Sequence, residues 1–497
     1  MKNITSYITL IALGLLSISC EKSLTTAPTT QVAESEVYRT TANIETVMNG
    51  TWRYLNDTYF TYANPGYSTI MRTSDAMAND VAVTTKYGYR DPYAFTDLNN
   101  KASTRVRAIW TLLYKVIDNT NNIIAKTPTS EGSQVDKDRL IGQAKTLRAF
   151  AYLTFASYYQ HSYLLDKNAL AVPIYTEPST TSTVGKGKAT LEEIYTLILS
   201  DLTNSATLLD QYDRPTSDKF KINKNVVYGL LARAYLNIGD WKNAAEAAKK
   251  ARENHSLMNP TSYLEGFNDL QNEEWIWGHK QTPDQSTASY TFHYLDVSSA
   301  ASYYYSFMAD PYFKDLFDEN DIRYRLFEWD SSVGREGFLR YKKFRFRPNL
   351  TGDIVYMRTA EMYLIEAESY ARLGNIQAAT TALNTLREAR MSATTTISNT
   401  QDLIKEILIE RRKELWGEGF GLADIIRNKD KVERKEFKNA DGSPILIDIK
   451  DENGVIKKVA GQGHRVTRFP DGSSFTINSN YYLFSIPQEE SLQNPNL

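Results

Sequence analysis

Apolar residues recur every three or four positions over much of the chain, which is the spacing that places side chains on one face of an α-helix. The clearest case is the stretch 356–427. Its first half carries one such face, formed by Met357, Ala360, Leu364, Ala367 and Tyr370. Gly374 interrupts the face, and the same spacing starts again at Ile376. A glycine between two apolar helical faces predicts a tight turn, so this stretch is expected to contain a helical hairpin.

The pattern occurs a second time, earlier in the chain, at 231–251. There the bulky, small and turn residues match the slots of a tetratricopeptide repeat: Leu231, Ala232, Tyr235, Gly239, Trp241, Ala244 and Ala251. The later copy matches in Ala367, Tyr370, Gly374 and Ala379, with Glu366 in the place of Leu231. The turn glycines Gly239 and Gly374 lie 135 residues apart, whereas tandem repeats recur every 34. Long non-repeating segments must therefore be inserted between the two units.

Helical spacing also covers 104–160 and 190–253, and a capping box at 190–193 marks the start of one helix. Turn dipeptides such as Asp441-Gly442 and Asp471-Gly472 predict small β-hairpins in an insertion at 435–480. We therefore expect a mainly α fold in which tetratricopeptide-like hairpins form a scaffold with long irregular insertions and a few short β-hairpins. A single domain would span 35–497.

Two of the insertions, about 56–100 and 263–347, have no helical period and are rich in aromatic residues among Asn, Asp, Thr and Gly. The whole chain holds 33 tyrosines and 7 tryptophans. Because repeats act as scaffold, these two insertions are where we expect function.

The N-terminus has the features of a secretory signal, with one lysine, a run of about a dozen apolar residues and small residues before Cys20. Cys20 is the one cysteine of the chain. We interpret 1–19 as a signal peptide and 20–34 as a tether whose first residue, Cys20, is lipidated. The alternatives are a buried N-terminal helix and an unmodified thiol.

Other chemistry is weakly represented. The 57 basic and 59 acidic residues leave no basic excess for nucleic acid. The five histidines include no metalloprotease pair, and the glycines of 417–421 follow a predicted helix rather than a strand. We expect no enzyme activity, no cofactor, no metal and no nucleic-acid partner.

Several segments together resemble the RagB/SusD family of surface lipoproteins: Ala144–Tyr152, Leu231–Gly239, Arg358–Glu368, Glu410–Leu415, Glu418-Gly419 with Asp424, and the Ile486-Pro487 and Asn494–Leu497 tail. The chain departs from the family pattern at Gly421, where arginine is frequent, and in the turn before Val172-Pro173-Ile174. The resemblance implies a protein anchored by acylated Cys20 to outer-membrane lipid, at the cell surface. It also implies a SusC-like, TonB-dependent transporter as partner, with the repeat side and the segment after Cys20 as the contact.

The expected ligand is an oligosaccharide or polysaccharide, since the C–H faces of sugars pack on aromatic rings while their hydroxyls need polar side chains. The candidate contacts are Asp80, Tyr87, Tyr89 and Arg90 in the first insertion and Tyr290, His293, Tyr294, Tyr303 and Tyr304 in the second. This hypothesis requires the two insertions to lie side by side with exposed rings. Alternatively, each aromatic packs its own loop onto the scaffold. A peptide-capturing relative and an assembly protein without a small ligand are the rival functions.

Overall fold

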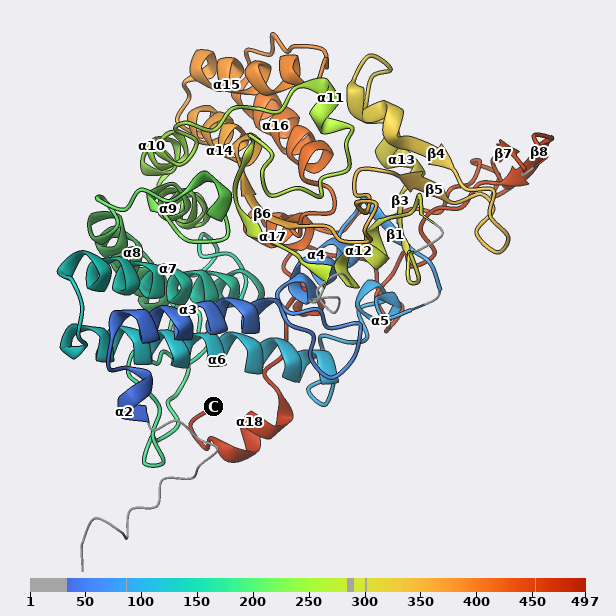
Figure 1. Cartoon of the computed structure of the whole chain (residues 1–497). Coiled ribbons are helices and arrows are strands. Elements are labelled where there is room, and N and C mark those ends of the chain that lie inside the picture. The colour runs from blue at the N-terminus through green and yellow to red at the C-terminus, as the bar shows by residue number, and fades with distance from the viewer. Residues whose placement is uncertain (1–33, 86, 284–289, 300–301, 452) are drawn as a thin grey trace, which may run out of the picture.

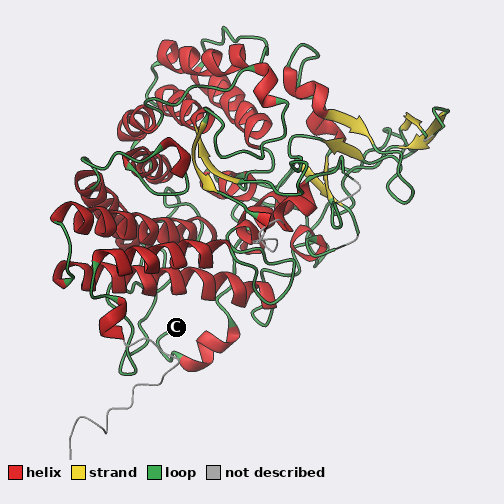
Figure 2. Ribbon diagram, in the orientation of Figure 1, coloured by secondary structure: helices red, strands yellow, loops and turns green. Residues whose placement is uncertain are grey.

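A computed structural model describes residues 34–85, 87–283, 290–299, 302–451 and 453–497. The chain is mainly helical, with a few short strands among and beside the helices (Figures 1 and 2). This confirms the predicted fold class. The predicted signal peptide and Cys20 lie outside the described residues.

The scaffold is a curved stack of antiparallel helices. Each of its members packs against the next: α6 (Thr104–Lys126), α7 (Gln134–Tyr158), α8 (Leu191–Leu208), α9 (Lys224–Ile238), α10 (Trp241–Ala251), α14 (Thr359–Arg372), α15 (Ile376–Ala389) and α16 (Thr400–Leu415). Because α10 packs directly on α14, the two repeat units are neighbours in space although a long segment separates them in sequence (Figure 1). The insertion between them leaves the stack and returns to it.

Both predicted turns end in a left-handed glycine. Gly239 closes α9 with φ 80° and Gly374 follows α14 with φ 76°, a conformation that favours glycine. Asp240 and Asn375 then cap α10 and α15 through their side-chain oxygens. The unusual Glu366 is buried in α14, and its carboxylate accepts hydrogen bonds from Arg252 just beyond the end of α10. An ion pair thus links the two units at this position.

The first insertion is less irregular than predicted. It contains α4 (Ser68–Met77), β1 (Val81–Val83) and the short α5 (Arg90–Tyr93). Every residue of α4 is buried, including Arg72 and Asp75. Six of its ten residues are polar although they are buried. Such a composition is also typical of loops, and this is why the expectation of a loop over 56–100 was wrong here.

The second insertion forms four of the eight strands in the described part of the chain. These are β2 (Trp275–His279), β3 (Phe307–Ala309), β4 (Phe327–Trp329) and β5 (Leu339–Tyr341). The short helix α11 (Pro260–Tyr263) precedes β2, α12 (Tyr290–Leu295) lies between β2 and β3, and α13 (Pro311–Lys314) lies between β3 and β4. β3 pairs antiparallel with β1 of the first insertion, in the register Val81↔Ala309 and Val83↔Phe307. The resulting sheet has the order β1-β3-β5-β4. The two insertions therefore share one sheet.

A buried ion-pair network ties this region to the scaffold. Arg358, at the end of β6 (Ile354–Arg358), donates to Glu414 of α16 and to Glu274, both at 2.6 Å. β6 itself pairs with β2. All three side chains have no exposed surface. Since removing one partner of such a pair leaves an uncompensated buried charge, the network fixes the strands firmly against α16.

The remaining helices and strands are α2 (Glu34–Val37), α3 (Thr41–Asn56), which packs on α6 and α7, α17 (Gly421–Arg427), which packs on α4 and α7, the hairpin of β7 (Leu446–Lys450) and β8 (Ile456–Ala460), and α18 (Gln488–Gln493). The β7–β8 hairpin projects from the body, and the C-terminus lies near α2 and α18 (Figure 1). Within the part of the chain that the structure describes, no helix is long and apolar enough to cross a membrane.

Candidate functional site

Aromatic rings from the two insertions meet beside the shared sheet. Tyr62 of the first insertion stacks on Tyr304 of the second, with ring centroids 4.5 Å apart and planes 16° apart. Tyr87 packs edge-on against the same Tyr304 ring at 5.3 Å. Tyr303 lies 6.2 Å from Tyr304. The two insertions are therefore side by side, as the carbohydrate hypothesis requires.

We define the aromatic platform as the outer rings of this cluster, Tyr62, Tyr87, Tyr303 and Tyr304, together with Phe60, which lies two residues before Tyr62. Phe60 is 59% exposed, Tyr62 38% and Tyr303 68%. Tyr87 and Tyr304 are half-buried. Large rings are seldom exposed together without a binding role, so the platform is the best candidate for a ligand surface.

Two platform residues have an unfavourable backbone conformation. Phe60 has φ 63° and Tyr87 has φ 69°, in the left-handed region that bulky residues rarely adopt. Such a residue costs on the order of 1 kcal/mol or more, and strain of this kind is concentrated at functional sites. The surrounding fold holds both rings outward at that cost.

A second layer of rings supports the platform from below. Tyr89 and Tyr294 have no exposed surface, and their rings meet edge-on at 4.7 Å. Tyr294 in turn lies 5.7 Å from Tyr304. The expectation that Tyr89 and Tyr294 contact a ligand is thereby corrected, because both rings are used to fill the space under Tyr304.

Arg105, near the start of α6, fixes the first insertion. Its guanidinium donates to the Asp97 carboxylate at 2.7 Å, to the Ala63 carbonyl at 2.8 Å and to the Gly88 carbonyl. It also lies 4.5 Å from the centroid of the Tyr89 ring. One buried cation thus joins three points of the loop to the scaffold.

His293 plays the corresponding part in the second insertion. It is 8% exposed, and its Nδ1 accepts a hydrogen bond from the Tyr303 backbone N–H at 3.3 Å. Burial lowers the pKa of His293, which favours the neutral ring that can accept this bond. The His293 and Tyr303 rings lie 5.1 Å apart. His293 therefore positions Tyr303 and is itself nearly covered.

The remaining candidates lie apart from these ring contacts or cannot be placed. The Asp80 carboxylate is paired with Arg412 of α16, with contacts of 2.6 and 3.0 Å, so it ties β1 to the scaffold. Arg90 is exposed and pairs with the adjacent Asp91 at 3.1 Å. Tyr290 begins α12, but its side chain lies outside the described ones.

Phe60 and Tyr62 were not among the predicted site residues. They stand with Tyr59 in a loop, and nothing in the sequence distinguishes the exposed rings from the packed one. Tyr59 donates from its hydroxyl to the Tyr54 carbonyl, and its ring packs at a tilt against the Tyr54 ring, with centroids 4.8 Å apart. Only the path of the loop decides which of these aromatics faces outward.

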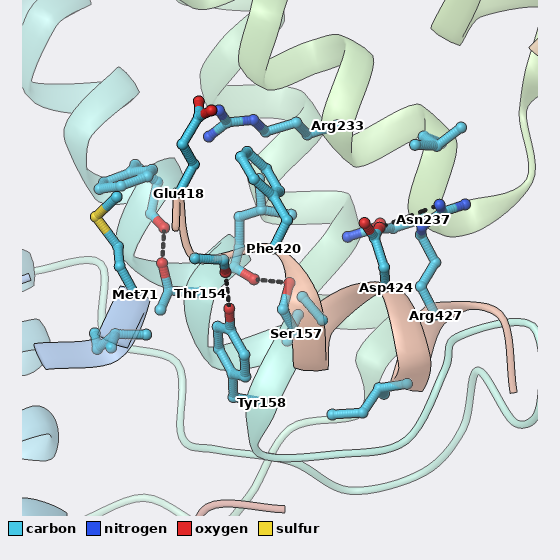
Figure 3. Close-up of a pocket in the computed structure, with 18 of the residues that line it drawn as sticks. Met71, Thr154, Ser157, Tyr158, Arg233, Asn237, Glu418, Phe420, Asp424 and Arg427 are labelled. Atoms are coloured by element: carbon cyan, nitrogen blue, oxygen red, sulfur yellow. Dashed lines mark hydrogen bonds and ion pairs between the residues drawn. The ribbon is translucent and has the colours of Figure 1, made fainter. Parts of the chain in front are cut away.

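A separate cavity of about 100 Å³ lies between α7, α9 and α17 (Figure 3). Several of its polar groups have partners: Tyr67 with Thr154 at 3.2 Å, Tyr158 with the Gly419 carbonyl at 3.0 Å, and Arg427 with Glu368 at 2.6 Å. Two buried nitrogens of its lining, Arg411 Nη1 and Arg427 Nε, have no hydrogen-bond partner among the described groups. The cavity is therefore part of the contact by which α17 packs on the scaffold. Among the described residues, no group of three or more His, Cys, Asp or Glu side chains could hold a metal ion.

Comparison with known proteins covers most of the chain. Residues 271–497 match the model of the SusD family, and residues 31–236 match a family described as "Starch-binding associating with outer membrane". A SusD-like carbohydrate binding protein of Bacteroides vulgatus is 42% identical, with a TM-score of 0.87; the match covers 92% of this chain and 97% of that one. A SusD superfamily protein of Bacteroides thetaiotaomicron is 23% identical over 92% of this chain and 98% of that one, with a TM-score of 0.77.

A SusD-like protein of Formosa agariphila is 22% identical over 87% of this chain and 92% of its own length. The helical stack with its shared-sheet insertions and the match to a 42% identical relative over nearly the full chain agree. The chain belongs to the SusD/RagB family.

Proposed function

We propose that this protein captures oligosaccharides at the cell surface on its aromatic platform and delivers them to a partner TonB-dependent outer-membrane transporter. The observation that carries the proposal is the platform itself, in which two insertions present exposed rings over a buried, tightly bonded layer. The relative from Bacteroides vulgatus that is 42% identical is named as a carbohydrate binding protein. The platform gives such a function a physical basis in this chain.

The arrangement suits weak, reversible binding of sugars. Tyrosine offers a flat ring and a hydroxyl, and it loses little side-chain freedom on contact. Phe60 and Tyr303 are more than half exposed, so little of a ligand bound on these rings would be enclosed. We expect dissociation constants that are micromolar or weaker, on the order of 8 kcal/mol or less. Delivery requires release, so weak binding fits the proposed role.

The proposed anchor and partner rest on the sequence and the family. Acylated Cys20 would hold the protein on the outer-membrane lipid, leaving the folded domain in the aqueous phase at the cell surface. The repeat side, with the segment after Cys20, would contact the transporter. Co-purification of the transporter with the tagged protein from detergent-solubilised membranes would support this partner, and its loss after substitutions on the repeat side would locate the contact.

Calorimetry with a glycan panel and with a peptide digest tests the ligand class. We expect heat of binding with at least one glycan, and none with the peptides. Binding of peptides alone would favour the peptide-capturing alternative. A protein that binds neither, and whose platform variants grow normally on every polymer, would be an assembly protein.

A further inference from the structure

A groove of about 280 Å³ runs along α6 beyond the platform. We call it the α6 groove. Its floor is Trp110 and Tyr114 of α6, one wall is the segment 173–185, and the other is the C-terminal segment 490–497. Tyr114 and Tyr175 are half-buried and offer ring surface, while Glu177 and Glu490 add carboxylates. The groove thus holds aromatic rings beside hydrogen-bond acceptors, the same combination of groups that suits a sugar.

Both walls of the groove are fixed by side-chain amides. Asn121 donates to the carbonyls of Tyr175 and Glu177 at 3.1 and 3.0 Å. Asn494 donates to the Lys186 carbonyl at 2.9 Å, and Asn496 donates to the Gly185 carbonyl at 2.7 Å. Tyr114 donates to the Pro173 carbonyl at 2.8 Å. The groove is therefore formed before any ligand arrives, which reduces the entropic cost of binding.

One face of α6 connects the groove with the edge of the platform. Arg107 lies one turn before Trp110 and two turns before Tyr114, so all three share one face of α6. Arg107 stacks on Phe60 of the platform, 4.7 Å from the ring centroid, and pairs with Glu489 of α18 at 3.1 Å. The next residue, Glu490, lines the groove. At 1.5 Å per residue, Arg107 and Tyr114 are about 10 Å apart along α6.

From this connection we propose that the α6 groove is a second subsite for the same glycan, so that the ligand is an extended chain rather than a mono- or disaccharide. This inference rests on the proposed function of the platform. One part of the glycan would lie on Tyr303, Tyr62 and Phe60, and the part that extends beyond Arg107 would enter the groove. There Tyr114 and Tyr175 would contact sugar faces, and Glu177 and Glu490 would accept from hydroxyls, as charge-assisted hydrogen bonds.

The test compares ligands of increasing length. The polymer is chosen by affinity electrophoresis of the native protein in gels that contain soluble starch, xylan, mannan or pectin. Size fractions of its partial hydrolysate are then titrated by calorimetry against four proteins. These are the native protein, the groove variant Glu177→Ala/Glu490→Ala, the platform variant Tyr303→Ala, and the control Glu246→Ala/Glu253→Ala, which removes two exposed carboxylates on the repeat side. Thr183→Trp, which fills the groove and keeps its carboxylates, is a second groove variant.

We expect the affinity of the native protein to keep rising with glycan length, also for fragments that are too long to fit on the platform alone. Both groove variants should lack this increase, so that their affinity for the longest fraction is at least tenfold lower than that of the native protein. Their affinity for the shortest fraction that binds should stay within twofold of the native value. The platform variant should lose affinity at every length. If the groove variants match the control at all lengths while the platform variant fails, the second subsite is refuted and the platform stands. If no polymer retards the native protein, or if Tyr303→Ala leaves the affinity unchanged at every length, the proposed function of the platform is itself refuted.

Discussion

Tyr62 and Tyr304 stack face to face at 4.5 Å, one from each of two insertions that lie far apart in the sequence. Neither insertion builds the platform alone. The pairing of β1 with β3 brings the insertions together, and the Tyr62–Tyr304 stack is a second contact between them. A change in either insertion is therefore expected to affect the whole site.

Replacing Tyr303 by alanine should weaken glycan binding at least tenfold. Tyr303 is 68% exposed, so its ring is available to a ligand and contributes little to the core. A contact that costs 1.4 kcal/mol when it is truncated corresponds to a tenfold loss of affinity. The stability of this variant should stay within about 0.5 kcal/mol of the native value, since exposed positions rarely matter more. Calorimetry and thermal melting check the two parts, and unchanged affinity would remove Tyr303 from the site.

Replacing Arg105 by alanine should damage both stability and binding. The substitution leaves the Asp97 carboxylate without its partner and releases the carbonyls of Ala63 and Gly88. The loss of one partner of a buried ion pair costs on the order of 3 kcal/mol. Lys115→Ala, at an exposed position of the same helix, is the matched control. A variant that melts like the control and binds normally would show that Arg105 does not hold the loop.

Asp310→Asn should stabilise the protein at high pH. Burial, and then the neighbouring Asp80, raise the pKa of Asp310 to about 7, and its Oδ1 lacks a hydrogen-bond partner. A carboxyl whose pKa is higher in the folded state stabilises the fold while it is protonated, and that contribution is lost as pH rises from about 4 to 7. The asparagine has no charge to bury, so the gain at pH 8 should be on the order of 2 kcal/mol and should vanish near pH 4.

Chemical denaturation at pH 4, 6 and 8 measures the Asp310→Asn effect. Asp315→Asn, an exposed carboxylate one short helix away, should change stability little at any pH. A gain for Asp310→Asn that is the same at all three pH values would contradict the titration.

Replacement by alanine should change the stability of the protein in opposite directions at two glycines that have open space around them. Gly50 lies inside α3, and Gly374 ends the α14 turn with φ 76°; an added Cβ would meet nothing within 4 Å at either position. Gly50→Ala should raise the free energy of unfolding by about 1 kcal/mol, because alanine has the higher helix propensity. Gly374→Ala should lower the free energy of unfolding by about 1 kcal/mol, because an L-residue is strained at that φ. Thermal midpoints that shift in the same direction would contradict this reasoning.

Cys20→Ala should abolish labelling of the protein by a fatty acid in the native host. Cys20 follows the apolar N-terminal run and is the single thiol of the chain. Ser19→Ala, next to it, should keep the label. Gel fluorescence after feeding an alkyne fatty acid measures both, and a label that persists without Cys20 would refute the anchor.

The sequence by itself determined the helical stack. Its signals are local: a 3.6-residue apolar period, capping residues and turn glycines such as Gly239 and Gly374, each readable within a few positions. The aromatic content of the two insertions was equally visible, and it indicated where function is to be sought. The buried helix α4 was missed, because six of its ten residues are polar and such a composition is also typical of loops.

Only the tertiary structure decided which aromatics face outward. Tyr89 and Tyr303 are the same residue type in the same kind of region, yet Tyr89 has no exposed surface and Tyr303 has 68%. Exposure depends on contacts with residues far along the chain, such as Arg105 over Tyr89. A single sequence carries no record of such distant contacts, so it located the two regions and left the choice of rings to the fold.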